Sequence, residues 1–357
     1  MRSTDILINI CGSPFVEEQN HSFSDSELLK AYEVAFPDRV ALLYLTKHRK
    51  DGWDARLEDK YQALHQRRLM TIKVVASLAE TMNSFYSENY VIFKSVKPYP
   101  ATPNDTDVLF LGEKKQYEKA YRFLLNQGYK FHEWAPQQRT LYDPRGEGKI
   151  GQGKKGGTYY IDFYEEISTD YYAYLNKKAL IPYIIKQEIN GIPVNLLRPE
   201  PELAIVLFHN VFPERTYQLE HFYLPLYYLS NPEFDKELFI SFVRRQNLEE
   251  AVKVNLTFCS YLHQKYFNFV PEPITYLLNQ LGTSNKELQR FIEHGAKTPY
   301  MFSPRQFFKT FFHKSLDSYA LKSLFIQSFK MLNPIFLLDV MKSLKNRLSQ
   351  EGTYHLE

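Results

Sequence analysis

The feature that most constrains the fold is a strand-turn-strand segment, residues 90–111, with the sequence YVIFKSVKPYPATPNDTDVLFL. Residues 91–93 are β-branched or aromatic, which is typical of a buried strand. Three prolines within residues 97–104 exclude a helix there. The apolar run 108–111 predicts a second strand after this turn. We therefore expect these two strands to form the centre of the fold.

Three carboxylates accompany these strands. Asp105 and Asp107 are two residues apart, so on an extended chain they point to the same face, with Cα atoms roughly 6.5–7 Å apart. Asp162 lies in another apolar run, residues 159–164. Burying an aspartate costs free energy unless a cation or hydrogen-bond donors offset it. Three such residues on neighbouring strands can hold two divalent cations. For Asp105 and Asp107 alone, the alternative is a turn that caps the strand.

Length and composition indicate a globular protein of about two domains. The chain has 357 residues, of which 44% are hydrophobic and 24% charged. No apolar run reaches the roughly 20 residues that span a bilayer, and the first residues do not resemble a signal peptide. We therefore expect a cytoplasmic protein with no membrane partner. Cys11 and Cys259 fit no metal or redox spacing, which predicts buried reduced thiols.

Helical patterns flank the central strands. Residues 56–86 predict one long amphipathic helix, and a capping box at Ser24 begins a shorter helix before it. We expect an α+β fold: an N-terminal helical segment that packs on the core (1–88), a small mixed β-sheet core (89–198) and an all-helical C-terminal domain (199–357).

Within the expected core, the pattern predicts one helix over 117–126 and further strands over 139–142, 158–164 and 189–197. A glycine- and lysine-rich loop, residues 143–157, joins the first two of these strands. A solvated hairpin connection is one interpretation of this loop. The other is that its cations reach a polyanionic substrate: Arg145, Lys149, Lys154 and Lys155.

The order of these features resembles the DNA polymerase β-type nucleotidyltransferase superfamily. The resemblance lies in a long helix, a strand, the small residue Ser95, the motif Asp105-Thr106-Asp107 before an apolar strand, and the later Asp162. The layout is most similar to the poorly characterised nucleotidyltransferase-like proteins of prokaryotes. The motif covers about residues 90–165, and the rest of the chain resembles that group more loosely.

The resemblance implies a metal-dependent enzyme. Such an enzyme moves a nucleoside monophosphate from a nucleoside triphosphate such as ATP to an acceptor hydroxyl on RNA, protein or a small molecule, and releases pyrophosphate. Carried over to this chain, Asp105 and Asp107 would ligate the Mg²⁺ or Mn²⁺ ions that bind the triphosphate. Asp162 would ligate the catalytic metal and orient or deprotonate the acceptor hydroxyl. These three aspartates are the predicted catalytic and metal-binding residues.

Three residues of the turn are predicted to bind the nucleotide. Ser95 matches the Gly/Ser position whose hydroxyl and amide contact phosphate in the superfamily. Lys94 stands where the superfamily has glycine, and its side chain would obstruct the close approach of phosphate that glycine permits. Lys94 or Lys97 would instead supply positive charge. The alternative function is a catalytically inactive protein of the same fold that acts as a nucleotide- or nucleic-acid-binding or regulatory module.

Two C-terminal features have open interpretations. His209 lies on an apolar helical pattern, where a satisfied core histidine is expected before a ligand; Glu220 and His221 are weaker candidates. Residues 300–350 carry an excess of six positive charges among several phenylalanines. This pattern fits a surface that faces nucleic acid. We favour the other interpretation, in which the aromatic residues are core and the lysines are solvated.

Overall fold

The computed structural model describes most of the chain. The described residues are 3–17, 23–49, 53–103, 105–135, 137–144, 159–169, 172–330, 332–334, 336–338 and 340–341. Several basic residues of the loop 143–157 and of the positively charged segment 300–350 therefore lie outside the described residues: Arg145, Lys149, Lys154, Lys155, Lys342, Lys345 and Arg347.

A mixed seven-stranded sheet forms the centre of the molecule, in the order β3-β4-β5-β2-β1-β9-β8. The pairs β1–β9 and β2–β5 are parallel and the other neighbours are antiparallel. The strands are β1 (Tyr90–Phe93), β2 (Asp105–Phe110), β3 (Lys130–Ala135), β4 (Gln138–Tyr142), β5 (Tyr160–Tyr164), β8 (Ile184–Ile189) and β9 (Ile192–Leu197). The predicted α+β class with a mixed sheet is confirmed.

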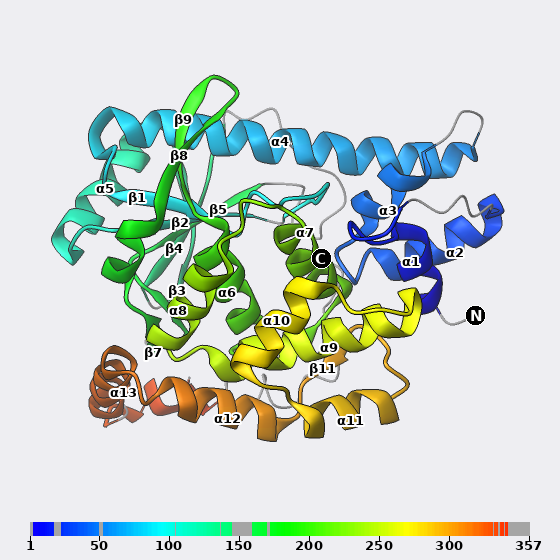
Figure 1. Ribbon diagram of the computed structural model, residues 1–357. Coiled ribbons are helices and arrows are strands. Elements are labelled where there is room, and N and C mark those ends of the chain that lie inside the picture. The colour runs from blue at the N-terminus through cyan, green and yellow to red at the C-terminus, as the bar shows by residue number, and fades with distance from the viewer. Residues whose placement is uncertain are drawn as a thin grey trace.

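Helices cover both faces of this sheet (Figure 1). On one face, helices α4 (Ala55–Tyr86) and α5 (Lys114–Asn126) pack residues such as Val75 and Tyr117 against Ile92 of β1. On the other face, Val91 belongs to a larger core that includes helix α6 (Pro199–Val211). Because both faces of β1 are buried, its continuous apolar sequence needs no polar alternation.

The structure contains several strands that the sequence did not reveal. The strand predicted over 189–197 is confirmed as β9, which follows a turn at Asn190 and Gly191 with φ values of +50° and +77°. The preceding strand of this hairpin, β8, was missed. The two edge strands of the sheet, β3 and β8, expose most of their side chains and lack an apolar pattern. Two short strands were also missed: β6 (Ile167–Thr169) and β7 (Tyr172–Leu175), which precede the 3₁₀ helix η1 (Lys177–Tyr183).

Helices make up most of the remaining chain. The N-terminal ones are α1 (Ser3–Cys11), α2 (Asp25–Ala35) and α3 (Ala41–His48). The later ones are α7 (Leu219–Leu229), α8 (Lys236–Arg245), α9 (Glu249–Phe267), α10 (Glu272–Leu281), α11 (Asn285–Glu293), α12 (Pro304–Lys314) and α13 (Ser318–Lys330). The C-terminal part is not strictly all-helical, because β10 (Thr216–Tyr217) pairs with β11 (Tyr300–Met301).

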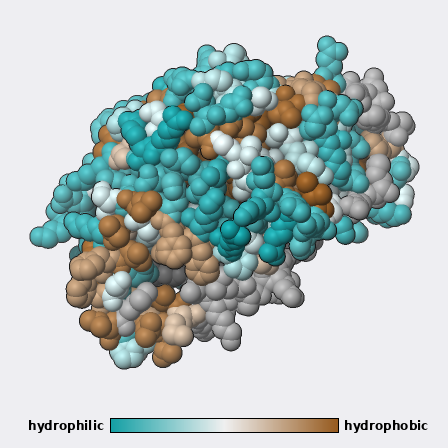
Figure 2. Space-filling model, turned by 60° about the horizontal axis from the view of Figure 1, so that its bottom comes forward, coloured by the Kyte–Doolittle hydropathy of each residue, from teal (hydrophilic) through white to brown (hydrophobic). Residues whose placement is uncertain are grey.

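The surface of α12 and α13 is strongly apolar (Figure 2). Phe312 and Phe325 are 64% and 63% exposed, whereas Phe307 is buried. Lys314 is itself buried and donates a hydrogen bond to the Gln246 carbonyl. The interpretation of this segment as core aromatic residues with solvated lysines was therefore wrong for Phe312, Phe325 and Lys314.

Both cysteines are buried and unpaired, as predicted. Within the described ranges, no helix combines the length and the apolar character needed to cross a bilayer. The cytoplasmic location stays a prediction.

Candidate functional site

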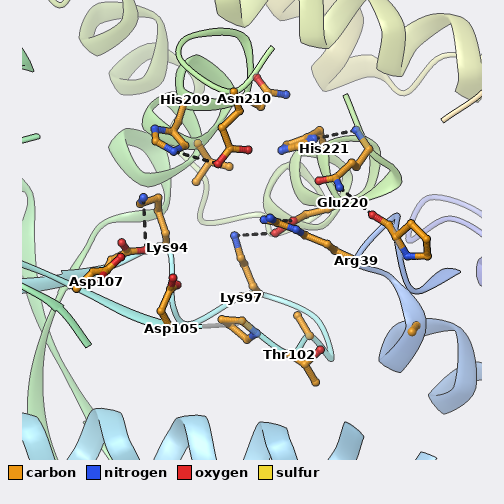
Figure 3. Close-up of a pocket in the computed structure, with 18 of the residues that line it drawn as sticks. Arg39, Lys94, Lys97, Thr102, Asp105, Asp107, His209, Asn210, Glu220 and His221 are labelled. Carbon is orange, nitrogen blue, oxygen red and sulfur yellow. Dashed lines mark hydrogen bonds and ion pairs between the residues drawn. The ribbon is translucent and has the colours of Figure 1, made fainter. Parts of the chain in front are cut away.

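The sheet brings the three predicted aspartates to one cavity. Asp107 lies directly opposite Asp162 in the parallel pair β2–β5, and Asp105 is two residues earlier on β2. All three line a cavity of about 330 Å³ (Figure 3 labels Asp105 and Asp107). Because side chains two apart share a face of a strand, the register aligns all three carboxylates.

Burial and mutual repulsion disfavour the charged forms of Asp105 and Asp162. Burial raises the pKa of Asp105 to about 8, with further contributions from the Asp107 and Asp162 carboxylates. Burial, followed by Asp107, also raises the pKa of Asp162. The Thr140 hydroxyl opposes this second effect by donating a hydrogen bond of 2.7 Å to Asp162 Oδ1. A cation bound at this end of the cavity would favour the ionised carboxylates and lower these pKa values.

Lys94 supplies one cation to this end. Its Nζ is 3.4 Å from Asp107 Oδ2 (Figure 3). Burial lowers the pKa of Lys94, but the Asp107 carboxylate and other nearby groups outweigh burial and raise the pKa overall. Its φ is +59°, a left-handed conformation that favours glycine, and its backbone N–H donates to Glu202 Oε1 at 3.0 Å. The turn therefore keeps a glycine-like backbone here and directs an ammonium group at Asp107.

Ser95 lies beside the cavity but is absent from its lining. Its hydroxyl donates to the Phe93 carbonyl at 3.0 Å and accepts the Asp107 backbone N–H at 2.9 Å. In this arrangement both bonds hold the turn onto β2 and position Asp107. The expected phosphate contact of the Ser95 hydroxyl would require one of these bonds to be exchanged.

Lys97 contacts a different part of the cavity. Its Nζ is 3.0 Å from Glu220 Oε1, and Arg39 Nη1 is 3.6 Å from Glu220 Oε2. Figure 3 shows Lys97 and Arg39 pointing toward Glu220, close to His221. We call Arg39, Lys97 and Glu220 the cation wall. It combines the loop before α3, the β1–β2 turn and the first turn of α7.

His209 also lines the cavity. Its Nδ1 is 3.0 Å from the Tyr174 hydroxyl, and its Nε2 is 3.3 Å from Glu214 Oε1. Burial, then the charge of Lys94, lowers the pKa of His209, which favours the neutral ring at pH 7. The expectation of a satisfied histidine agrees with these contacts, but its place is a cavity wall beside Lys94 rather than the apolar core.

Sequence reasoning missed several residues of this cavity region, among them Thr140, Arg39 and Arg67. Thr140 is the antiparallel partner of Asp162 on β4, and no local motif in the sequence reveals this register. Arg39 and Arg67 line the cavity from the N-terminal helical segment, and no local motif marks either residue. Glu220 and His221, judged the weakest candidates, also line the cavity.

The donor set partly fits a divalent metal. Carboxylate oxygens are the ligands that Mg²⁺ and Mn²⁺ prefer, and Asp105, Asp107 and Asp162 supply them on one face of the sheet. However, among the residues that the structure describes, no three His, Cys, Asp or Glu side chains are grouped so that they could hold a metal ion. The chemistry of Asp105, Asp107 and Asp162 fits such an ion, and their side chains would have to reorient around it.

Comparisons of this chain with protein-family models, with curated proteins and with solved structures found no match. The residues of the cavity therefore carry the functional inference.

Proposed function

We propose that this protein is a metal-dependent nucleotidyltransferase. It would move a nucleoside monophosphate from a nucleoside triphosphate to an acceptor hydroxyl, with RNA and protein among the candidate acceptors. The observation that carries the proposal is the placement of Asp107 opposite Asp162 on parallel strands, with Asp105 on the same face, inside one cavity. Three crowded carboxylates lower stability, which is typical of residues kept for function.

In the proposed reaction, the acceptor oxygen forms a bond to the α-phosphorus. The bond from that phosphorus to the β-phosphate oxygen breaks, and pyrophosphate leaves with the electron pair. Asp162, held by the Thr140 hydroxyl, accepts the proton of the acceptor hydroxyl. Asp105, Asp107 and Asp162 would hold Mg²⁺ or Mn²⁺, which when bound neutralises the triphosphate and aligns the attacking and leaving oxygens.

The turn after β1 would serve the phosphates. Lys94, whose ammonium group lies 3.4 Å from Asp107 Oδ2, would supply positive charge to the phosphate oxygens. Ser95 would position Asp107 through the bond from the Asp107 N–H to its hydroxyl. Positioning and charge carry most of phosphoryl-group transfer, so the proposal requires no protein nucleophile.

The test is transfer of label from each α-labelled nucleoside triphosphate, with Mg²⁺ or Mn²⁺, to the protein itself, total RNA and a cell extract. We expect label with the wild type and a loss of about a thousandfold in Asp107→Asn, since several kcal/mol of charge stabilisation disappear. Glu88→Gln, an exposed acid in a surface ion pair, is the matched control. Equal labelling by wild type and Asp107→Asn would contradict the proposal.

A second candidate is a nucleotide-binding or regulatory protein of the same architecture without turnover. It is favoured by the 3.4 Å contact between Lys94 Nζ and Asp107, in which the ammonium takes the role of a metal. This candidate predicts stabilisation by nucleotide, about 2.7 kcal/mol at 100 times the dissociation constant, with no labelled product. Lys94→Gly keeps the left-handed backbone without strain, and labelling that appears only in this variant would identify Lys94 as the cause of inactivity.

A further inference from the structure

The cation wall has the composition of a site for an anion. One carboxylate, Glu220, receives a different cation at each oxygen: Lys97 at Oε1 and Arg39 at Oε2. Burial raises the pKa of Glu220, but Lys97 and then Arg39 outweigh burial and lower it to about 2, so the carboxylate is ionised. Both cations therefore meet at this carboxylate. Glu202 also interacts electrostatically with Lys97, and Glu214 with Arg39. A phosphate group offers more oxygens and up to two negative charges to the same pair of cations.

The backbone around Arg39 is held in an unusual conformation. Arg39 has a φ of +58°, which costs roughly 1–2 kcal/mol for a residue with a Cβ. Its neighbour Asp38 fixes this turn: the Asp38 carboxylate accepts the Leu219 N–H at 3.0 Å and the Thr298 hydroxyl at 2.9 Å. The Asp38 carbonyl also accepts the Glu220 N–H at 3.1 Å. The same bonds therefore fix Arg39 and Glu220 relative to each other.

The wall is accessible from the cavity. All three of its residues line the cavity that also contains the aspartates, and the Arg39 side chain is 41% exposed. Lys97 extends from the same turn as Lys94, three residues later, so one turn serves both ends of the cavity. An ion pair that only joined the N-terminal and C-terminal segments would not need a strained, half-exposed arginine at the cavity.

We propose that Arg39 and Lys97 bind a phosphate group of the substrate, and that Glu220 holds both cations until that group replaces it. The location of this site rests on the residues of the wall. Its assignment to a substrate rests on the proposed transferase function. The phosphate has two possible sources: the polyphosphate end of the nucleoside triphosphate, or a phosphate already present on the acceptor.

The experiment is isothermal titration of the full-length protein with inorganic tripolyphosphate, in EDTA and at low salt. We expect wild type to bind and Arg39→Gln to bind about tenfold more weakly, because one charged hydrogen-bond donor is lost. Arg39→Gln keeps the buried Lys97–Glu220 pair, so folding should be preserved. Lys186→Gln removes the same charge from an exposed ion pair and should bind as wild type.

Glu220→Gln should change the affinity for tripolyphosphate in the opposite direction. Removing the competing carboxylate should tighten tripolyphosphate binding about tenfold, whereas a site that depends only on net charge would respond equally to any lost acid. Glu88→Gln, an exposed acid, is the control for that effect. Circular dichroism checks that the buried Lys97 is tolerated. Equal affinities for wild type, Arg39→Gln and Glu220→Gln, or no binding by any of them, would overturn the proposal.

These measurements separate the anion site from the transferase. They use no metal and no turnover, so Arg39-dependent binding in a protein that transfers no label would retain the anion site and reject the transferase. The source of the phosphate group is then determined by repeating the titration with tripolyphosphate in the presence of Mg²⁺ and saturating ATP. Competition between ATP and tripolyphosphate assigns the site to the nucleotide phosphates, whereas simultaneous binding assigns it to the acceptor.

Discussion

The two ends of the cavity differ in how their charges are balanced. At the sheet end, three aspartates face one nearby lysine, and burial with mutual repulsion raises the pKa of Asp105 to about 8. At the cation wall, two cations face Glu220, whose pKa is lowered to about 2. The first end is destabilised by its own charges and the second is stabilised by them. We infer that ligand binding would stabilise the sheet end more than the wall. The wall also joins distant parts of the chain.

The largest stability effect should come from breaking the wall. Lys97→Met leaves Glu220 as a buried charge without its closest partner, and we expect the free energy of unfolding to fall by about 3–5 kcal/mol. Urea denaturation measures this change. Lys186→Met, which breaks an exposed ion pair with Glu88, should cost about 0–1 kcal/mol. Similar losses in both variants would show that the wall pair is no more important than a surface pair.

Asp38, which holds the turn that carries Arg39, should make the stability of the protein depend on pH. Burial raises the pKa of Asp38 from 3.8 to about 7, although bonds from Leu219 and Thr298 oppose this. The folded state therefore holds a proton that the unfolded chain releases, so the stability that this group contributes is present below about pH 4 and is lost as pH rises through about 7.

Asp38→Asn should remove this dependence. Between pH 4 and pH 7, we expect wild type to lose roughly 2–4 kcal/mol of unfolding free energy relative to Asp38→Asn. Urea denaturation of both proteins at each pH isolates the contribution of this carboxyl. Parallel pH profiles for the two proteins would show that Asp38 does not titrate in this way.

Removing a charge from the sheet end should raise the free energy of unfolding, whereas removing one from the wall should lower it. Asp105→Asn removes one of three crowded carboxylates, and we expect a gain of about 1–2 kcal/mol in unfolding free energy at pH 8 together with a loss of nucleotide transfer. Thermal and urea denaturation measure the gain. A destabilised variant would mean that Asp105 is held by favourable contacts that outweigh repulsion.

The smallest effect concerns the support of Asp162. Thr140→Val keeps the shape of the side chain but removes the hydroxyl that donates to Asp162 Oδ1 at 2.7 Å. We expect a loss of about 1 kcal/mol in stability, and about a tenfold lower transfer rate because Asp162 is less well oriented. An unchanged rate with lowered stability would restrict the role of Thr140 to folding.

Local patterns predicted much of the fold. The Ser24 capping box forms as expected: Ser24 Oγ accepts the Glu27 N–H, and the Glu27 carboxylate accepts the Ser24 N–H. The long helix and the central strands were recognisable because their apolar residues follow helical or strand periods. Strand β8 was not recognisable, because Lys186 and its neighbours are exposed and give no alternation. Polar edge strands are defined by the pairing of their backbone, which no local pattern reveals.

The sequence by itself determined that Asp105 and Asp107 share a face, since the two-residue period of a strand is a local property. Only the tertiary structure decided that Asp162 lies opposite Asp107, because strand register depends on the whole sheet. The cation wall is a tertiary feature throughout. Arg39, Lys97 and Glu220 come from three distant segments, and their contact depends on packing of both helical segments against the turn after β1.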